Sequence, residues 1–218
     1  MENSRFQRAS EYAINLLQRE LLPAFTFHNV NHTVDEVVRF CNRLADLEKI
    51  DEESRRLLLV AAYFHDTGLA TIQGLDLDTF NAGRAVHEEQ AVKIIYEILP
   101  AYGFEIEEVQ TVARLIMATK WAHIPGDILE QIIRDADMGA LGEATDYFMH
   151  ISDALQQELR SFGMVIEDAD WYANQKDLLE THVFHTMSAR NLFDSNKLVN
   201  AAAMQARLNA LNHEASEI

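Results

Sequence analysis

Several histidines and aspartates of this sequence lie at the ends of apolar segments, where they could bind a metal ion together. The pair His65-Asp66 directly follows the most apolar stretch of the chain, where an ionised carboxylate is costly to bury unless it is paired or metal-bound. His32 begins an amphipathic segment, and Asp135-Ala136-Asp137 ends another. Imidazole and carboxylate ligands together suit Zn, Mn, Fe, Ni or Mg. Four such ligands from three helices predict a divalent metal site with positions left open for water and substrate.

These residues also have plainer interpretations. A His-Asp dipeptide recurs by chance, and His65-Asp66 could simply cap a helix and bond to loop backbone. His28 lies four residues before His32, and the two could form a surface pair. Asp135 and Asp137 lie two positions apart, so they point to different sides of a helix, and the apolar stripe leaves both at its borders. Periodicity alone therefore leaves open which of these two aspartates is the ligand.

The elements that must position these residues are expected to be helices throughout. The chain has only 8 glycines and 3 prolines, which is few for the many turns of a β-sandwich. Apolar residues recur at helical spacing, no segment alternates as a strand would, and a loop with irregular helix is expected over 70–85. The predicted helices cover residues 5–22, 33–49, 51–68, 86–99, 107–119, 127–141, 143–161, 168–191 and 195–213. The predicted fold class is all-α.

The helix from Asp51 to Gly68 is expected at the centre of the fold. Asp51 can cap its N-terminus, Gly68 can end it, and residues 57–64 are apolar all round, which is typical of a buried helix. Asp127 can cap a later helix in the same way. Four aromatic residues are expected in the core rather than stacked on a substrate: Tyr96, Trp121, Trp171 and Phe184.

The bulk composition restricts the partners of this protein. The formal net charge is −17 and no Lys/Arg-rich segment offsets it, so binding to the nucleic-acid backbone is not expected. Cys41 is the single cysteine, which excludes an intramolecular disulfide and favours a reducing compartment. Charges interrupt the N-terminal residues, and no apolar run approaches the roughly 20 residues needed to cross a bilayer. We expect a cytoplasmic protein without a membrane partner; a homo-oligomer stays open.

The order His, His-Asp, Asp resembles the HD superfamily of metal-dependent phosphohydrolases. The similarity extends over about residues 27–142, through the successive blocks HNVNHTVDEV, AAYFHDTG, HEEQAVKIIYEILPAYGF, LIMATK and IIRDADMGALG. It implies an HD-domain helical bundle over residues 1–142. The stretch containing Trp171, Gln175, His182 and Thr186 is similar to the helical extension of some of these proteins. No Ser/Gly/Pro-rich linker separates it from the rest, so residues 143–218 are expected to pack on the bundle as one compact unit.

The resemblance also assigns roles to the candidate residues. It implies that His32, His65 and Asp66 bind the metal, and that Asp66 orients the attacking water as well. The family's Ala-Asp pattern matches Ala136-Asp137, so Asp137 is taken as the fourth ligand and Asp135 as a second-shell or structural acid. Family members with two metals often have a further His pair, but the segment Ala118 to His123 has one histidine.

Four further residues have functional and structural interpretations side by side. The HNxxHxxD pattern resembles that of cyclic-nucleotide phosphodiesterases, which implies that His28 protonates the leaving group; alternatively His28 only fixes its loop. His87 and Glu88 begin a helix, where they could meet a phosphate or a second metal, or simply cap the helix. Lys120 could bind a substrate phosphate, or complement the dipole at a helix C-terminus.

The leading hypothesis is metal-dependent hydrolysis of a phosphate ester, with a nucleotide as the expected small-molecule substrate. A cyclic-nucleotide or dinucleotide phosphodiesterase is the alternative within this chemistry. A metal-stabilised signalling or sensor domain with little turnover is the alternative that is not an enzyme. All three hypotheses require the metal ligands, but only the two enzymes need a proton donor. A non-haem iron oxygenase is a further alternative. The incomplete set of ligands for a second metal ion is evidence against it.

Overall fold

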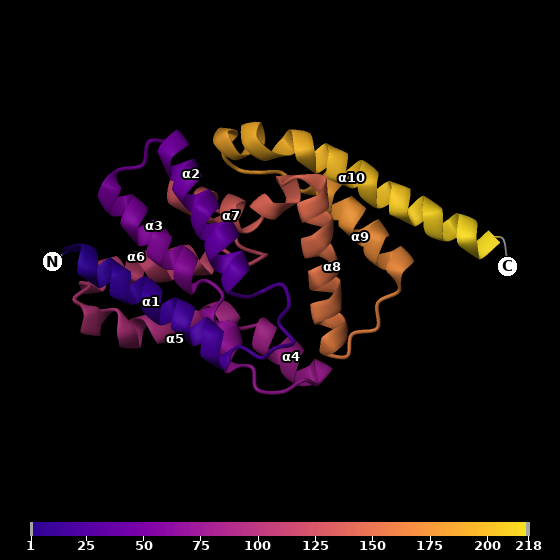
Figure 1. Cartoon of the computed structure of the whole chain (residues 1–218). Coiled ribbons are helices and arrows are strands. Elements are labelled where there is room, and N and C mark those ends of the chain that lie inside the picture. Colours follow the sequence, from indigo (N-terminus) through magenta and orange to yellow (C-terminus); the bar gives the residue numbers. More distant parts are fainter. Residues whose placement is uncertain (1, 217–218) are drawn as a thin grey trace.

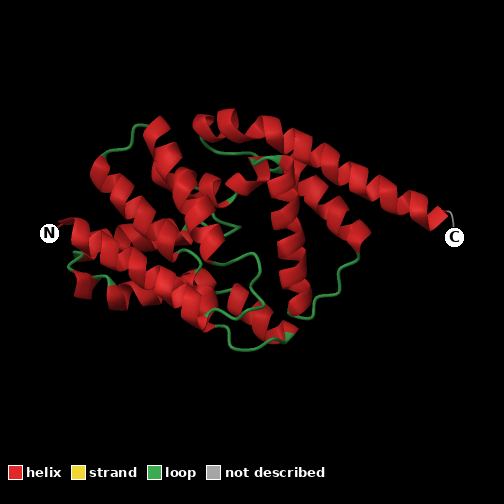
Figure 2. Ribbon diagram, viewed as in Figure 1, coloured by secondary structure: helices red, strands yellow, loops and turns green. Residues whose placement is uncertain are grey.

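The computed structural model describes residues 2–216, and every regular element in that range is helical (Figure 2). The all-α prediction is therefore confirmed. The α-helices are α1 (Glu2–Glu20), α2 (Arg39–Leu47), α3 (Glu52–Phe64), α4 (Leu77–Arg84), α5 (His87–Ile98), α6 (Ile106–Met117), α7 (Ile128–Asp137), α8 (Thr145–Ser161), α9 (Asp168–Thr181) and α10 (Met187–Ser216). The short elements are the π-helix η1 (His32–Val38) and the 3-10 helices η2 (Thr67–Thr71), η3 (Pro100–Tyr102) and η4 (Gly139–Gly142). No described helix is long and apolar enough to span a membrane.

Side-chain caps fix where two of the central helices begin. Asp51 accepts a hydrogen bond from the Ser54 amide at the start of α3, and Asp127 accepts from the amides of Leu129 and Glu130 at the start of α7. Each cap satisfies backbone donors that have no partner inside the helix. Both capping predictions are confirmed. The caps fix where α3 and α7 begin, and the C-terminal ends of these two helices lie close together.

Helix α3 is the centre of the N-terminal bundle, as predicted. It packs against α1, α2, α6 and α7, and the side chains of Leu58, Ala61 and Phe64 are fully buried. The helix ends at Phe64, four residues before the predicted end at Gly68. Gly68 instead lies in η2, where a Cβ atom would come within 1.8 Å of the His87 carbonyl oxygen. A glycine here lets the chain after α3 pass directly beneath the start of α5.

The C-terminal helices lie along one side of this bundle (Figure 1). Helix α8 stands between the bundle and α9, and α10 packs along α9 and also contacts η4, α8, α2 and α7. The predicted helices 168–191 and 195–213 have the wrong boundaries, because the chain leaves the helical path at residues 182–186. The Asp135 carboxylate accepts hydrogen bonds from the amides of His185 and Thr186. The Thr186 hydroxyl accepts from the Ala189 amide at the beginning of α10. A contact with a distant helix therefore overrides the local helical pattern.

Two of the four predicted core aromatics lie at the surface. Trp171 and Phe184 are buried, but Trp121 is 69% exposed and Tyr96 is 42% exposed. Trp121 lies in the turn between α6 and α7, where no helix covers it, and Tyr96 faces outward from α5. Residue type alone was the basis for placing them in the core, and for these two it was wrong.

Candidate metal centre

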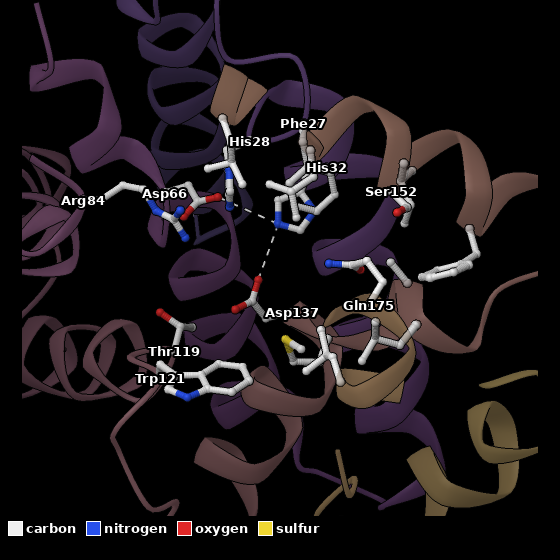
Figure 3. A pocket seen from close by; sticks show the side chains of 18 of the residues that line it. Phe27, His28, His32, Asp66, Arg84, Thr119, Trp121, Asp137, Ser152 and Gln175 are labelled. Carbon is white, nitrogen blue, oxygen red and sulfur yellow. Dashed lines mark ion pairs between the residues drawn. The ribbon is translucent and has the colours of Figure 1, made fainter. Parts of the chain in front are cut away.

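Four ligand-type atoms converge where the ends of η1, α3 and α7 meet. Figure 3 shows three of these side chains, His32, Asp66 and Asp137. The Asp66 Oδ2 atom lies 3.1 Å from His65 Nε2 and 3.8 Å from His32 Nε2. The Asp137 Oδ1 atom lies 3.4 Å from His32 Nε2 and 3.6 Å from His65 Nε2. Donors bound about 2.1 Å from one ion are about 3.0–3.4 Å apart in octahedral or tetrahedral arrangements. The ligand atoms of His32, His65 and Asp66 all lie within 4.8 Å of one another, and Asp137 adjoins both histidines, which is nearly the spacing of a metal coordination shell.

Hydrogen bonds on the far side of each imidazole ring point its other nitrogen at this centre. His32 Nδ1 lies 2.8 Å from Glu36 Oε2, one turn along η1, and His65 Nδ1 lies 2.8 Å from the Ala62 carbonyl oxygen. Since a carbonyl or carboxylate can only accept, each Nδ1 carries a proton, and it is Nε2 whose lone pair the neutral ring would offer to a metal. This is the tautomer that metal-binding histidines require.

The buried polar atoms of this site fit a bound cation. His32, His65 and Asp66 are each at most 4% exposed, and His65 Nε2 and Asp66 Oδ2 make no hydrogen bond within the described part of the chain. Burial lowers the pKa of His32, but hydrogen bonds with Asp137 and Glu36 and the charge of Asp66 outweigh it and raise the pKa to about 10. So much surrounding negative charge favours a bound cation. The residues therefore fit a divalent metal ion, although the donor set does not identify it.

Asp135 points away from this centre and has other partners. Its two carboxylate oxygens accept from the amides of His185 and Thr186 at 2.7 and 2.8 Å, and Oδ2 also accepts from the Thr186 hydroxyl at 2.8 Å. It is fully buried, while Asp137 at the last position of α7 faces the two histidines. The structure thus separates the two aspartates: one joins the α9–α10 connection and the other joins the ligand cluster.

Comparison with known protein families agrees with this arrangement. A family model described as HD domain matches residues 30–138, which contain all four clustered side chains. The chain belongs to the HD domain family. Comparison with curated proteins and comparison with solved structures each gave no match. HD domains bind divalent metals and are mostly metal-dependent hydrolases of the phosphohydrolase superfamily.

Two further residues at the start of α5 adjoin the HD ligand cluster. His87 donates from Nδ1 to the Arg84 carbonyl at 2.7 Å, which leaves its Nε2 facing Asp66 Oδ1 at 3.5 Å. Burial lowers the pKa of His87, but the hydrogen bond with Asp66 and its charge raise the pKa to about 9. Glu88 is buried, which raises the pKa of its carboxyl group. Both side chains line the same cavity as the cluster.

His28 lies beside the cluster and is held by a residue that the sequence did not single out. Its Nδ1 lies 2.5 Å from Glu158 Oε1, and the other carboxylate oxygen of Glu158 accepts from the amides of Phe27 and His28 at 2.9 Å. Burial raises the pKa of Glu158, but the charge of His28 and these hydrogen bonds outweigh it and lower the pKa. The only sequence signal for this role was a fully buried glutamate position on an amphipathic helix, α8.

The cations near the site are distributed differently from expectation. Lys120 pairs with Glu89 at the surface, and its side chain does not line the cavity. Arg84, the last residue of α4, lines the cavity instead, and Figure 3 shows its guanidinium group directed toward Asp66. No carboxylate partner for Arg84 occurs within residues 2–216, so its charge is available to an anion. Sequence reasoning missed Arg84, whose only signal was its position three residues before His87.

A cavity of about 360 Å³ opens onto the ligand cluster. One side is polar and contains His28, His87, Glu88 and Arg84 near the cluster. The opposite side is largely apolar and is formed by residues of η4, α8 and α9. The volume lies within the range of pockets that bind small organic molecules.

Proposed function

We propose that this HD protein hydrolyses phosphate esters, with a nucleotide as substrate, and that His32, His65, Asp66 and Asp137 hold the divalent ion. The observation that carries the proposal is the cluster of two imidazole Nε2 atoms and two carboxylate oxygens at a cavity that His32, Asp66 and Asp137 line. An ion bound there lowers the pKa of a coordinated water and offsets negative charge on a phosphoryl oxygen. The chain's own residues account for the remaining steps.

Asp66 and His87 are placed to orient water and accept its proton. Asp66 directs Oδ2 at the histidine ligands and Oδ1 at His87 Nε2, so one carboxylate connects the ligand cluster to a second imidazole. A water that attacks phosphorus must lose a proton as its oxygen forms the new bond. The Asp66 carboxylate can accept this proton, and the His87 imidazole beside it can hold that carboxylate in position.

His28 is placed to protonate the leaving oxygen. The carboxylate of Glu158 accepts the Nδ1 proton, which stabilises the imidazolium form and leaves the Nε2–H directed at the cavity edge. When the bond between phosphorus and the ester oxygen breaks, that oxygen takes the Nε2 proton and leaves as an alcohol. A buried glutamate dedicated to one histidine supports the enzyme over a sensor domain, which needs no proton donor.

A cyclic-nucleotide phosphodiesterase is the second candidate function. The same acid would serve a diester, because that reaction also expels an alkoxide, and the HNxxHxxD pattern supports it. The cavity of about 360 Å³ is near the lower end of ligand pockets, which favours a single nucleotide over a dinucleotide.

The organisation and setting of the protein follow from the same site. We infer that residues 1–142 form the HD domain and residues 143–218 a helical extension that is part of the same compact unit. Glu158 and the cavity residues of α8 and α9 belong to this extension. The boundary at residue 142 therefore separates two parts of the sequence that contribute to one site. We place the protein in the cytoplasm and expect no nucleic-acid partner, in view of its single cysteine and net charge of −17.

The experiment is a substrate and metal screen on the purified protein. Nucleoside monophosphates, cyclic nucleotides and 4-nitrophenyl phosphate are tested with Mn, Mg, Zn, Fe or Ni added singly. His28→Ala should retain metal and lose about 10²–10⁴-fold in rate, while the matched control His150→Ala, at an exposed position of α8, should match the wild type. Oxygen consumption with iron and no phosphate release with any substrate would overturn the proposal.

A further inference from the structure

The apolar side of the cavity is built mostly by helices that follow the HD motifs, together with the end of the last motif block. Leu141 of η4, Phe148, Ile151 and Leu155 of α8, and Trp171 and Leu178 of α9 line it. The polar groups that a phosphate would need lie on the opposite side, where Arg84 and His87 adjoin the ligand cluster. A phosphorylated substrate bound at the cluster would therefore direct its organic part at the apolar side.

Gln175 of α9 is the exception within this apolar wall. Its side chain lines the cavity and the residue is only 9% exposed, and its amide has no hydrogen-bond partner within residues 2–216. Figure 3 shows the amide directed into the hollow, on the side of His32 and Asp137 away from Arg84. The amide faces the cavity with both its donor and its acceptor available, and a ligand that fills the cavity must pair with them or leave them without hydrogen bonds.

The other polar side chain on this wall already has a partner. Ser152 of α8 accepts a hydrogen bond from the Trp171 indole nitrogen at 3.1 Å, which fixes the ring as part of the wall. Gln175 alone among the cavity residues of α8 and α9 keeps both a donor and an acceptor free. An amide offers these two groups side by side in one plane.

We propose that the apolar wall binds the organic part of the substrate and that Gln175 determines specificity by pairing with a flat ring carrying a donor beside an acceptor, as a nucleobase edge does. The inference rests on the proposed function only in taking the ligand cluster as the place of the phosphate. Trp121 also lines the cavity, but it is exposed and lies on the side of Thr119, away from Gln175.

Binding of unphosphorylated nucleosides tests the wall separately from the reaction. Adenosine, guanosine, cytidine and uridine are titrated calorimetrically into manganese-loaded protein, and inorganic phosphate is titrated separately. Gln175→Leu should weaken the best-bound nucleoside about 5- to 100-fold and leave metal content and phosphate affinity unchanged. Asn174→Ala, at the exposed neighbouring position of α9, is the matched control and should bind like the wild type.

A second variant tests the hydrogen bonds rather than the packing. Gln175→Glu keeps the size of the side chain but only accepts, so the order of preference among the four nucleosides should shift toward rings that offer donors. Gln175→Leu should lower kcat/KM with a nucleotide substrate more than with 4-nitrophenyl phosphate, whose ring has no donor. The proposal is overturned if no nucleoside binds the wild type, if Gln175→Leu binds nucleosides unchanged, or if Trp121→Ala alone removes nucleoside binding.

The two proposals fail in different ways. Hydrolysis of 4-nitrophenyl phosphate without nucleoside binding would retain the phosphohydrolase and remove the role of Gln175. Nucleoside binding that depends on Gln175, without hydrolysis of any phosphate ester, would retain the specificity wall and remove the enzyme.

Discussion

The two sides of the cavity are built on different principles. On the ligand side, His32 and His65 each have one nitrogen fixed by a local acceptor, and Asp66 and Asp137 complete a cluster spaced within 3.1–3.8 Å. On the extension side, α8 and α9 supply apolar surface with one free amide at Gln175. Chemistry at a metal depends on atoms placed to a few tenths of an ångström, whereas a wall needs only shape and volume.

The difference also shows how the two sides depend on each other. Glu158 and Tyr147 of α8 reach across to the ligand side: the first holds His28, and the second donates from its hydroxyl to Glu36 at 2.6 Å. In the proposed function, the extension forms most of the substrate wall and also supports the proton donor and a metal ligand. Substitutions on the ligand side should lower metal content and reaction rate together. Substitutions on the extension side should lower the rate and leave the metal content largely unchanged.

The largest effect is expected from removing the Asp66 carboxylate. Asp66→Ala should lose the metal and reduce activity to below about one-thousandth, because the same carboxylate binds the ion and orients water. Metal content by plasma emission spectroscopy and the initial rate are measured on the same preparation. Added metal should also cease to raise Tm, since an ion bound only by the native state stabilises it. Full metal content in this variant and in His65→Ala would refute the ligand assignment.

A pair of matched variants separates the aspartates of α7. Asp137→Asn should empty the site, because it removes the charge of a direct ligand. Asp135→Asn should keep the metal and instead lower stability by about 1–3 kcal/mol, because the bonds to His185 and Thr186 weaken. Metal analysis and urea unfolding give the two readouts. An empty site in Asp135→Asn with a loaded, active Asp137→Asn would show that the ligand is the earlier residue.

An intermediate effect is expected from Glu158, on the extension side. Glu158→Gln should lower the rate about 10- to 100-fold with the metal retained, because a neutral amide stabilises the His28 imidazolium less than a carboxylate does. In combination with His28→Ala the loss should be no greater than for His28→Ala alone, since the two act as one unit. Additive losses would show that Glu158 acts independently of His28.

The pH dependence of stability checks the same contact. The folded-state pKa of Glu158 lies below its ordinary value of 4.5, because the His28 charge and backbone donors outweigh burial. Its stabilisation is therefore complete above that value and is lost as the pH falls through the lower folded-state pKa. The difference in Tm between wild type and Glu158→Gln should shrink on acidification below pH 4.5. A difference that grows with acid would contradict the sign of this shift.

The smallest effect is expected from Tyr147. Tyr147→Phe removes one hydrogen bond to Glu36, which still accepts from His32, so metal affinity should fall by no more than about tenfold. Competition with a fluorescent chelator measures the affinity, and Tyr96→Phe, at an exposed position of α5, serves as the control. Loss of the metal altogether would mean that the hydroxyl does more than orient Glu36.

The sequence predicts the ligand side better than the extension side for physical reasons. The caps at Asp51 and Asp127 and the apolar run before His65 are local patterns, so the central helix and its polar end could be inferred directly. The π-helix that begins at His32 could not, because its extra residue per turn leaves no periodic signal in seven residues.

Long-range contacts account for most of what the sequence did not reveal. The break after α9 depends on Asp135, fifty residues earlier, and the importance of Glu158 depends on His28, 130 residues earlier. Gln175 was noted only as part of a weaker family similarity, and Arg84 not at all. Their significance comes from the cavity that they share, which exists only in three dimensions.

The Asp135 contact also has a consequence for the order of events during synthesis. A ribosome completes α7 well before it reaches His185 and Thr186, and at about 5–20 residues per second the intervening fifty residues take roughly 3–10 s. During this interval the nascent chain holds every ligand residue but lacks the donors that neutralise the buried Asp135 carboxylate. The helix that carries Asp137 is thus locked in place only when the α9–α10 connection emerges, so maturation of the centre is expected late in translation.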